Sequence, residues 1–293
     1  MKNELNVGIF QMKCSSNKSK NQTKIEEKVN SFAHENIDLI VLQELHDNKY
    51  FCQTENINNF DLAEEIPGSA CLFYSELAKK NNLVLIASIF EKRTTGLYHN
   101  TAIVFEKNGT IAGKYRKMHI PEDPGYHEKF YFTPGDIGFE PIKTSIGTLG
   151  VLICWDQWYP EAARIMALKG AEILIYPTAI GFDENDTLEE HRLQINSWKT
   201  IQKSHAIANG IPLICVNRCG SEISEDSKSK ILFWGNSFIC GPQGETLYQA
   251  GKKEEFSITK IAMTGSEITR RKWPFLRDRR IDKYKEIQKI LID

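Results

Sequence analysis

Cys154 is the residue of this sequence whose surroundings best suit chemistry. It follows the apolar run Thr148–Ile153 and precedes a helix signal that begins near Pro160. A thiol between a buried strand and a helix start is favoured to ionise, and the thiolate is a strong nucleophile. The backbone N–H groups of the same turn, beginning with Trp155, are placed to hold a developing oxyanion. The alternative is an ordinary buried core cysteine.

Thiol chemistry also needs a base and a positive charge, and Glu44 and Lys117 are the candidates. Glu44 ends the apolar run Asp38–Gln43, at the strand edge where α/β enzymes usually place their sites. Partial desolvation there would suit a carboxylate to move protons. Lys117 lies where a predicted hairpin enters a proline-rich loop, and its ammonium could lower the thiol pKa and bind an oxyanion. For both residues a solvated surface position is the alternative.

Other enzyme classes are less well supported by the motifs. A papain-like protease would pair Cys154 with His119, His191 or His205, but the pattern that such proteases carry around their cysteine is missing. Neither GxGxxG nor GxxxxGK[ST] occurs, which disfavours a nucleotide-binding protein. The seven cysteines are an odd number without CxxC spacing, so neither a disulfide framework nor a zinc site is expected.

The order of apolar and amphipathic segments predicts an α/β fold in which helices cover the sheets. Buried runs rich in Val, Ile and Leu alternate with amphipathic stretches, as in strands covered on both faces. Turns at Asn108-Gly109 and near Gly244 each join two strand-like runs into a hairpin. These hairpins begin with similar sequences, Asn-Thr-Ala-Ile and Asn-Ser-Phe-Ile, which hints at two similar halves. The predicted helices span Asn21–Glu35, Ala70–Asn81 and Leu188–Asn209.

Composition indicates one domain that handles a small molecule. The 37 Lys and Arg nearly balance the 38 Asp and Glu, which leaves no electrostatic footprint for nucleic acid or an anionic membrane. No apolar run approaches the roughly 18 residues of a membrane span, and the N-terminus has no secretory pattern. We therefore expect a cytoplasmic protein with a single domain over residues 1–293.

Three segments taken together resemble the nitrilase superfamily of carbon–nitrogen hydrolases. They are Leu39–Gln53, Lys114–Asp136 and Leu149–Gly181, and the resemblance continues in the same order to Trp273–Arg280. Membership of this family implies a four-layer αββα sandwich of the α/β class. It also implies an assembly of two or more copies of the chain. The basic and aromatic C-terminal extension, about residues 265–293, is the segment expected to make the subunit contact.

The resemblance assigns roles to four residues. It implies a Glu-Lys-Cys triad that falls on Glu44, Lys117 and Cys154, and a second glutamate, Glu128, that helps to orient the lysine and position the substrate. In the implied reaction Cys154 attacks a ureido carbonyl, ammonia leaves, and water hydrolyses the resulting carbamoyl thioester. Neither a metal nor an organic cofactor is implied. A non-catalytic member of the family is the alternative, and retention of the triad positions argues against it.

The expected substrate is a ureido-amine, N-carbamoylputrescine being the example that the resemblance favours. After Ile180 the chain carries an acidic stretch, and we expect Asp183 or Glu184 to pair with the distal amine. An acidic helix start is the alternative for both residues. Other amidases of the superfamily, such as N-carbamoyl-β-alanine-type or ω-amidases, remain open. The alkyl chain would be walled by some of Tyr50, Phe51, Phe130 and Trp158.

Overall fold

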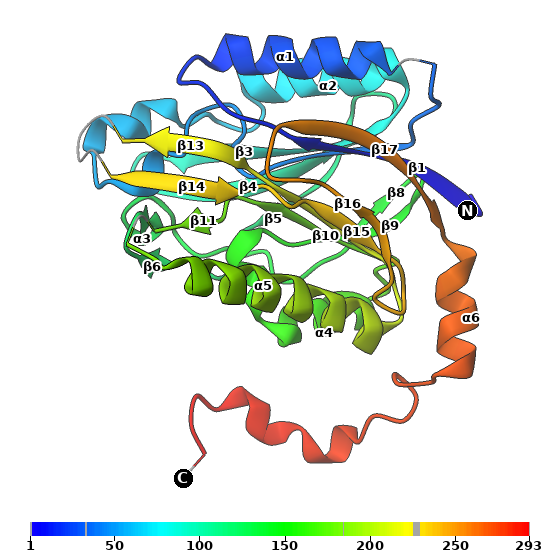
Figure 1. Cartoon of the computed structure of the whole chain (residues 1–293). Helices are drawn as coiled ribbons and strands as arrows, with labels where there is room; N and C mark the ends of the chain where they lie inside the picture. Colours follow the sequence, from blue (N-terminus) through cyan, green and yellow to red (C-terminus); the bar gives the residue numbers. More distant parts are fainter. Residues whose placement is uncertain (1, 33, 184, 225–228, 293) are drawn as a thin grey trace.

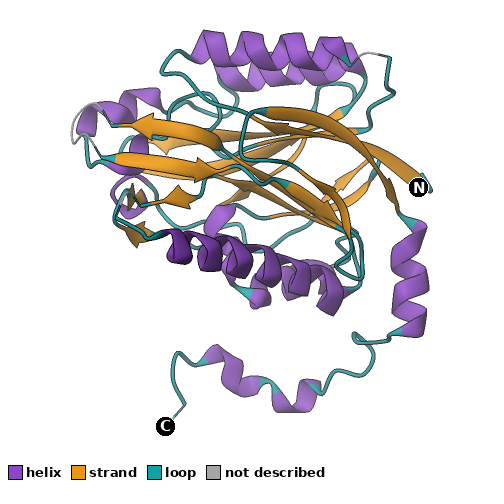
Figure 2. Ribbon diagram, in the orientation of Figure 1, coloured by secondary structure: helices purple, strands orange, loops and turns teal. Residues whose placement is uncertain are grey.

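Two six-stranded sheets pack face to face in the computed structural model of the chain, and helices cover both outer faces (Figure 1). The structure describes residues 2–32, 34–183, 185–224 and 229–292. Figure 2 shows the resulting order of layers, helix, sheet, sheet and helix. The predicted αββα sandwich is therefore confirmed.

The first sheet has the strand order β17-β1-β2-β3-β4-β5. Its strands β1, β2 and β3 run parallel, and β17, β4 and β5 pair antiparallel with their neighbours. A βαβ unit therefore starts the chain, as predicted. The strands are β1 (Glu4–Gln11), β2 (Leu39–Leu42), β3 (Val84–Thr94), β4 (Leu97–Phe105), β5 (Ile111–Arg116) and β17 (Glu255–Ala262).

The second sheet repeats this plan with the order β16-β15-β12-β10-β9-β8. Its strands β9, β10 and β12 are parallel, and antiparallel strands flank them on both sides. Both predicted hairpins are present, as β4–β5 and β15–β16. The strands are β8 (Ile142–Thr144), β9 (Gly147–Val151), β10 (Ile173–Thr178), β12 (Leu213–Asn217), β15 (Phe238–Cys240) and β16 (Thr246–Gln249).

Alternating side chains build an apolar layer on each face of the first sheet. Val84 and Ile86 of β3 point into the space between the sheets, where they share a buried cluster with Leu149 of β9 and Ile173 of β10. Leu85, between the first two, points the other way into the cluster beneath α1 and α2. Successive side chains of a strand face opposite sides, so one buried strand serves two layers.

Four helices form the outer layers. Helices α1 (Lys18–Ser31) and α2 (Ser69–Asn81) lie over the first sheet, and α4 (Pro160–Leu168) and α5 (Leu188–Asn209) lie over the second (Figure 1). The bounds of α5 match the prediction, and α2 starts one residue early. Helix α1 begins before the predicted Asn21 because the Asn17 side chain accepts a hydrogen bond of 3.0 Å from the Lys20 N–H and caps the helix there.

Shorter elements surround one end of the sandwich. Between Lys117 and Pro141 the chain is mostly irregular, as predicted, with a small hairpin and one helical turn. The remaining elements are β6 (Glu122–Asp123), β7 (Tyr126–His127), α3 (Glu128–Tyr131), β11 (Gly181–Phe182), β13 (Cys219–Ile223), β14 (Lys230–Trp234), and the 3₁₀ helices η1 (Phe51–Gln53), η2 (Ile57–Leu62) and η3 (Cys154–Trp158).

The C-terminal part of the chain leaves the sandwich after β17. Helix α6 (Thr264–Lys272) is followed by an arm with two short 3₁₀ helices, η4 (Ile281–Lys283) and η5 (Lys285–Gln288), which curves back below the layer of α4 and α5 in the view of Figure 1. Among the described residues, no helix is both long enough and apolar enough to cross a membrane.

Candidate active site

Cys154 begins the 3₁₀ helix η3 on a strained turn just after β9. Its φ of 43° lies in the left-handed region, which residues other than glycine rarely adopt and which clusters at functional sites. The turn is held by the buried Asp156 carboxylate, which accepts hydrogen bonds from the Ile153 N–H and the Tyr115 hydroxyl, each of 2.9 Å. These bonds fix the backbone that carries the thiol.

Lys117 lies between two carboxylates in the interior of the molecule. Its Nζ donates a hydrogen bond of 2.9 Å to Glu44 Oε1 and one of 2.6 Å to Glu128 Oε2, and all three side chains are fully buried. Asn100 Nδ2 donates to the same oxygen of Glu44 at 2.7 Å. Among the described residues, no partner reaches the other oxygen, Oε2. We call Glu44, Lys117 and Glu128 the charged cluster.

The charged cluster acts electrostatically on Cys154, but burial dominates the thiol. Burial raises the pKa of Cys154 well above its usual value, the Glu44 charge raises it further, and the Lys117 ammonium offsets only part of this. We expected the turn and the lysine to favour the thiolate. The Lys117 charge does lower the thiol pKa, but burial outweighs it, so the resting Cys154 side chain is a neutral thiol that would need a base to act as a nucleophile.

Within the charged cluster the lysine and the two carboxylates stabilise each other's charges, while the Glu44 charge raises the pKa of Glu128. Although burial disfavours the ammonium, the carboxylates of Glu128 and Glu44 raise the pKa of Lys117 well above its ordinary value. Burial raises the pKa of Glu128 to about 7, against the lowering effect of Lys117. Lys117 is therefore a permanent cation, and Glu128 titrates near neutrality.

The topology brings these residues together from strand ends. Glu44 follows β2, Lys117 follows β5 and Cys154 follows β9, while Glu128 starts the helical turn α3. The first two strands belong to one sheet and β9 to the other, so the site lies where the ends of both sheets meet. This matches the rule that side chains beyond strand ends build α/β sites.

A cavity of about 650 Å³ opens onto Cys154 and Glu128. Its wall includes the predicted residues Trp155, Trp158 and Asp183. Glu184, the other predicted amine ligand, lies outside the described residues. The further lining residues include two more carboxylates, two more aromatic side chains and a proline: Asp123, Asp186, Tyr126, Trp234 and Pro121.

Three of the four aromatic residues expected on the wall lie elsewhere, and the first of them, Phe51, is buried and stacks on Phe90 with ring centroids 4.9 Å apart. Tyr50 is 1% exposed, and its hydroxyl donates a hydrogen bond of 2.7 Å to Glu128 Oε1, so it stands behind the charged cluster. Phe130 packs against Phe60 and Tyr131, and the described residues that line the cavity do not include it. Of the four alternatives Trp158 lines the cavity, whereas the direction of the other three side chains did not follow from their order in the sequence.

The three histidines of the protease alternative are all engaged away from the thiol. His119 Nδ1 lies 2.7 Å from Asp156 Oδ1, and the ring of His191 stacks on Phe182 with centroids 3.6 Å apart. His205 Nε2 lies 2.8 Å from a backbone carbonyl of η3. All three rings are therefore engaged with other groups, and the charged side chains that act electrostatically on Cys154 are Glu44, Lys117 and Glu128.

Two polar residues of the site were missed from the sequence. Asn100, which donates a hydrogen bond to Glu44, belongs to the Asn-Thr-Ala-Ile sequence that was noted only for its similarity to the start of the other hairpin. Arg218 is fully buried, and its Nη2 donates to the backbone carbonyls of Glu44 at 3.1 Å and Leu45 at 2.7 Å. A lone arginine after an apolar strand gives no sign of such a role.

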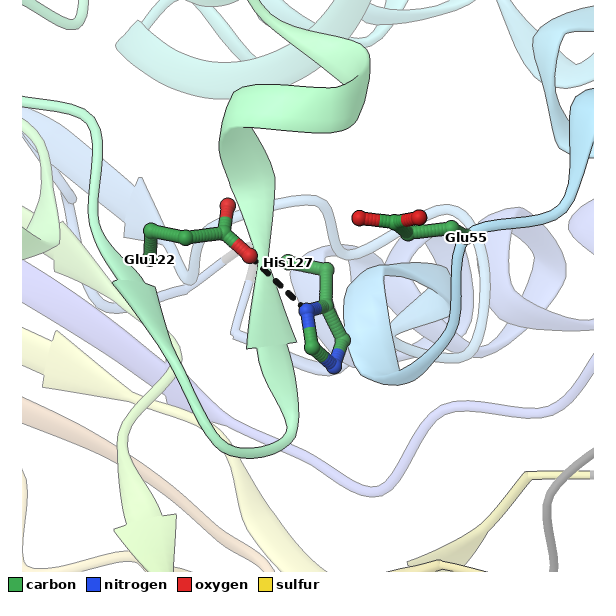
Figure 3. Close-up of side chains that lie close together, drawn as sticks. All are labelled: Glu55, Glu122 and His127. Carbon is green, nitrogen blue, oxygen red and sulfur yellow. Dashed lines mark hydrogen bonds and ion pairs between the residues drawn. The ribbon is translucent and has the colours of Figure 1, made fainter.

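The hairpin that leads into Glu128 is tied by a small polar cluster, shown in Figure 3. His127 Nδ1 of β7 lies 2.8 Å from Glu122 Oε1 of β6, and Glu55 points toward the same histidine. Each of the three offers one possible metal-ligand atom, these atoms lie within 4.8 Å of one another, and both glutamates are exposed. The pairing closes the β6–β7 hairpin immediately before Glu128.

Comparison with known proteins finds relatives over the whole chain. The carbon–nitrogen hydrolase family model matches residues 6–271. An N-carbamoylputrescine amidase of Oryza sativa subsp. japonica is 41% identical over 286 residues, 96% of this chain and 94% of that protein. A citrullinase of Francisella tularensis subsp. tularensis is 38% identical, over 97% and 98%. A crystal structure of a carbon–nitrogen hydrolase from Helicobacter pylori G27 is 53% identical with a TM-score of 0.96, covering 99% and 100%.

Proposed function

This chain belongs to the carbon–nitrogen hydrolase family, and from that premise we propose that it hydrolyses the ureido group of N-carbamoylputrescine to putrescine, carbon dioxide and ammonia. The observation that carries the proposal is the charged cluster beside a buried thiol, on a cavity with acidic residues in its wall. Relatives named for this substrate cover nearly the whole chain. Membership of the family alone makes the chain an amide-hydrolysing enzyme.

In the first half of the proposed reaction, Glu44 takes the proton of the Cys154 thiol as the sulfur adds to the ureido carbonyl carbon. A base is required because the resting thiol is neutral. The oxyanion that forms is held by the Lys117 ammonium and the Trp155 N–H. The bond to the terminal nitrogen then breaks, Glu44 returns the proton, and ammonia leaves a carbamoyl thioester.

In the second half, Glu44 deprotonates a water molecule that adds to the thioester carbonyl. The carbon–sulfur bond breaks, the thiol regains its proton, and a carbamate is released. The carbamate loses carbon dioxide and leaves the amine. The unpartnered Oε2 of Glu44 supports this double use of one carboxylate, because it is free to meet first the thiol and then water.

The carboxylates in the cavity wall support an amine on the substrate. Asp123, Asp183 and Asp186 all line the cavity, so an ammonium would meet a negative potential there. Asp183 Oδ1 already accepts hydrogen bonds from its own loop, at 2.9 Å and 2.8 Å from Asn185. We therefore assign amine binding to the carboxylates as a group, and expect Asp183 to share the task.

A second substrate has an observation in its favour. Citrulline also carries an ammonium at the end opposite its ureido group, so the same carboxylates in the cavity wall, Asp123, Asp183 and Asp186, would suit it as well. A relative named a citrullinase supports this reading.

The test is ammonia release from four classes of substrate by the wild-type enzyme. N-carbamoylputrescine should give the highest kcat/KM, followed by citrulline, N-carbamoyl-β-alanine and simple amides, and Cys154→Ala should release no ammonia from any of them. Preference for citrulline would move the assignment to the second candidate. Preference for the β-alanine derivative would overturn the amine assignment.

Charge reversal tests the acidic wall separately. Asp183→Lys and Glu184→Lys should raise the KM for N-carbamoylputrescine strongly and change the KM for simple uncharged amides little, because only the former carries an ammonium. Unchanged kinetics in both variants would reject this assignment. Glu189→Lys is the matched control, because Glu189 is exposed and pairs with Arg192 on the helix surface.

We also propose that the C-terminal extension, about residues 265–293, contacts a second copy of the chain. Its arm after α6 carries exposed large apolar side chains, which a solitary chain would leave in water. In the view of Figure 1 the arm curves back below the layer of α4 and α5, and its apolar side chains stay exposed, so a partner could pack against them. The exposed residues are Trp273, Phe275, Ile281, Tyr284, Ile287, Ile290, Leu291 and Ile292.

A further inference from the structure

We propose that Tyr50, backed by the buried ion pair between Arg218 and Glu222, is a positioning residue that holds the charged cluster in its reactive arrangement. The proposal rests on the proposed function in one respect, that the charged cluster takes part in hydrolysis. None of these three residues lines the cavity at Cys154, so their effect on the reaction would pass through Glu44 and Glu128.

Tyr50 holds Glu128 from the side opposite to Lys117. The Tyr50 hydroxyl donates to Oε1 of Glu128 at 2.7 Å, while Lys117 donates to Oε2 at 2.6 Å. Burial and the charge of Glu128 raise the pKa of Tyr50 well above its ordinary value, so the hydroxyl keeps its proton and remains a donor. The carboxylate is thereby fixed at both oxygens, which leaves it one orientation.

Tyr50 is itself held through its backbone by Glu222. The Tyr50 N–H donates to Glu222 Oε2 at 2.6 Å, and Arg218 Nη1 donates to Glu222 Oε1 at 2.7 Å. Both partners of this ion pair are buried, with exposures of 0% for Arg218 and 4% for Glu222. The arginine also packs over the ring of Phe233, with its guanidinium carbon 5.4 Å from the ring centroid.

Arg218 reaches the other glutamate of the charged cluster through the main chain. Its Nη2 donates to the carbonyls of Glu44 and Leu45, and its Nη1 donates to the carbonyl of Asn48 at 3.0 Å. Leu45 has a φ of 49°, in the left-handed region, so the turn after Glu44 needs such support. One guanidinium thus fixes the turn that aims the Glu44 carboxylate.

These contacts close into a ring. From the backbone of Glu44 it passes through Arg218, Glu222 and Tyr50 to Glu128, and Lys117 returns it to the Glu44 side chain. Every link is a hydrogen bond between buried groups. Both glutamates are therefore positioned by one frame, and a displacement at any link shifts the distance between them.

Energetics favour a positioning role over a stabilising one. Removing two charges from water costs about as much as their mutual attraction returns, and well-packed apolar residues often stabilise a core as much as a buried ion pair does. The pair of Arg218 and Glu222 contacts Tyr50 and not the cavity, so its main effect would be to orient the groups of the charged cluster. Preorganised groups within about half an ångström of the reactive geometry are what catalysis requires.

Tyr50→Phe is the central test, because it removes one hydroxyl and keeps the ring. We expect kcat to fall roughly tenfold or more, the effect of losing a hydrogen bond to a charged group, with KM changed by less than about twofold. The matched control is Tyr74→Phe, which removes another buried hydroxyl that donates to a carboxylate, that of Asp47, outside the ring. The control should keep wild-type kcat.

A second readout separates positioning from general loosening. The Tyr50 hydroxyl lowers the pKa of Glu128. Loss of this hydroxyl should therefore move the acid limb of the pH profile, the fall of kcat/KM at low pH, to higher pH, whereas Tyr74→Phe should leave the acid limb in place. The limb would be set by the groups that face Glu128, which come from several elements: Glu44, Tyr50, Cys52, Lys117, Tyr126 and Cys154.

Glu222→Gln tests the ion pair behind Tyr50. One amide oxygen can replace only one of the two acceptor oxygens of the carboxylate, so activity should lie between that of wild type and that of Glu222→Ala, with KM unchanged in both. Wild-type kcat and an unmoved acid limb in Tyr50→Phe, or equal losses of kcat in Tyr50→Phe and Tyr74→Phe, would overturn the positioning role.

All variants are assayed on every amide or ureide that the wild-type enzyme hydrolyses. A wild-type enzyme that ignores N-carbamoylputrescine would reject the proposed substrate, yet the ratio between Tyr50→Phe and wild type would still be read on the substrate that it accepts. Failure of the ring and failure of the proposed function therefore give different results.

Discussion

In the proposed reaction the Cys154 thiol loses its proton to a neighbouring carboxylate. Cys154 is buried with a raised pKa, Lys117 stays charged, and Glu128 titrates near neutrality. An exposed catalytic thiol would ionise by itself as the pH rises. Here the state of the carboxylates decides whether the thiol can react, so activity should follow Glu128 and not Cys154.

The first prediction is an acid limb in the pH profile near pH 7. Protonated Glu128 cannot accept hydrogen bonds from both Tyr50 and Lys117, so kcat/KM should fall as pH drops through the Glu128 pKa of about 7. No loss from Lys117 is expected on the alkaline side, because its pKa is raised. Steady-state kinetics across this range would check it, and a profile that stays flat through pH 7 would contradict it.

The titration of Glu128 would not itself unfold the protein on the acid side, so unfolding driven by this group would not cause the fall in kcat/KM. The folded-state pKa of Glu128 lies above its ordinary value of 4.5, so the stability that it contributes is fully present below 4.5 and is lost as pH rises through about 7. This group therefore favours the folded state on the acid side. Thermal unfolding measured at the same pH values is the control.

Sequence alone could place residues at strand ends and could not aim side chains in loops. Glu44 and Cys154 each follow an apolar run and Lys117 follows a predicted hairpin, so all three were expected at strand ends, and the resemblance joined them into one triad. Tyr50 lies in a connection without regular structure, where order along the chain does not give direction. Its place behind Glu128 required the three-dimensional structure.

Among the elements, η3 is the turn whose hydrogen bonds to the interior fix the position of Cys154. Asp156, in its middle, accepts from Ile153 before it and from Tyr115 of β5, and His119 donates its backbone N–H to Asp156 at 3.0 Å. One carboxylate thereby joins the end of β5, which leads to Lys117, to the turn that carries Cys154. Both sheets contribute to a single junction.

The second prediction concerns this junction. Asp156→Ala leaves several buried donors without an acceptor, so the free energy of unfolding should fall by about 3 kcal/mol and kcat should fall with it. Urea denaturation and steady-state kinetics would measure both. Glu245→Gln is the control, because its exposed carboxylate accepts from the Gln243 N–H at 2.8 Å, and a loss below about 0.5 kcal/mol is expected. Equal stabilities of the two variants would contradict the role of Asp156.

Element boundaries were predictable where the chain itself marks them. Helix α5 starts after Thr187, whose side chain and that of Glu190 form a reciprocal cap, and it ends at Gly210 with a φ of 60°. Helix α1 carries its start signal at Asn17, a cap that the apolar periodicity alone did not reveal. Capping residues therefore decide boundaries that periodicity leaves open.

At the scale of the whole molecule, the two sheets share one core and the C-terminal arm shares none of it. Residues of the arm such as Ile287 and Ile290 are exposed, whereas the core clusters are formed by the sandwich. The family model ends at residue 271, close to the end of α6. The arm is thus the part of the chain for which we propose a partner.

The third prediction tests the arm as a subunit contact. Ile287→Lys and Ile290→Lys place charges in the proposed contact, so the molar mass measured by light scattering after size exclusion should drop toward that of a single chain. Ile57→Lys is the control: Ile57 is 74% exposed but belongs to η2, in the sandwich, and its variant should keep the wild-type mass. Identical masses in all three variants would reject the contact.

Because all seven cysteines are buried, chemical labelling of thiols can count the accessible sites of the folded protein. Every thiol is free and buried, and Cys154 is the one that lines the described cavity. A small alkylating reagent offered to the folded protein should therefore reach a single sulfur per chain, whereas the denatured chain should take up seven. The fraction labelled in the native state would measure how many molecules of a preparation have an accessible Cys154, and the measurement needs no substrate.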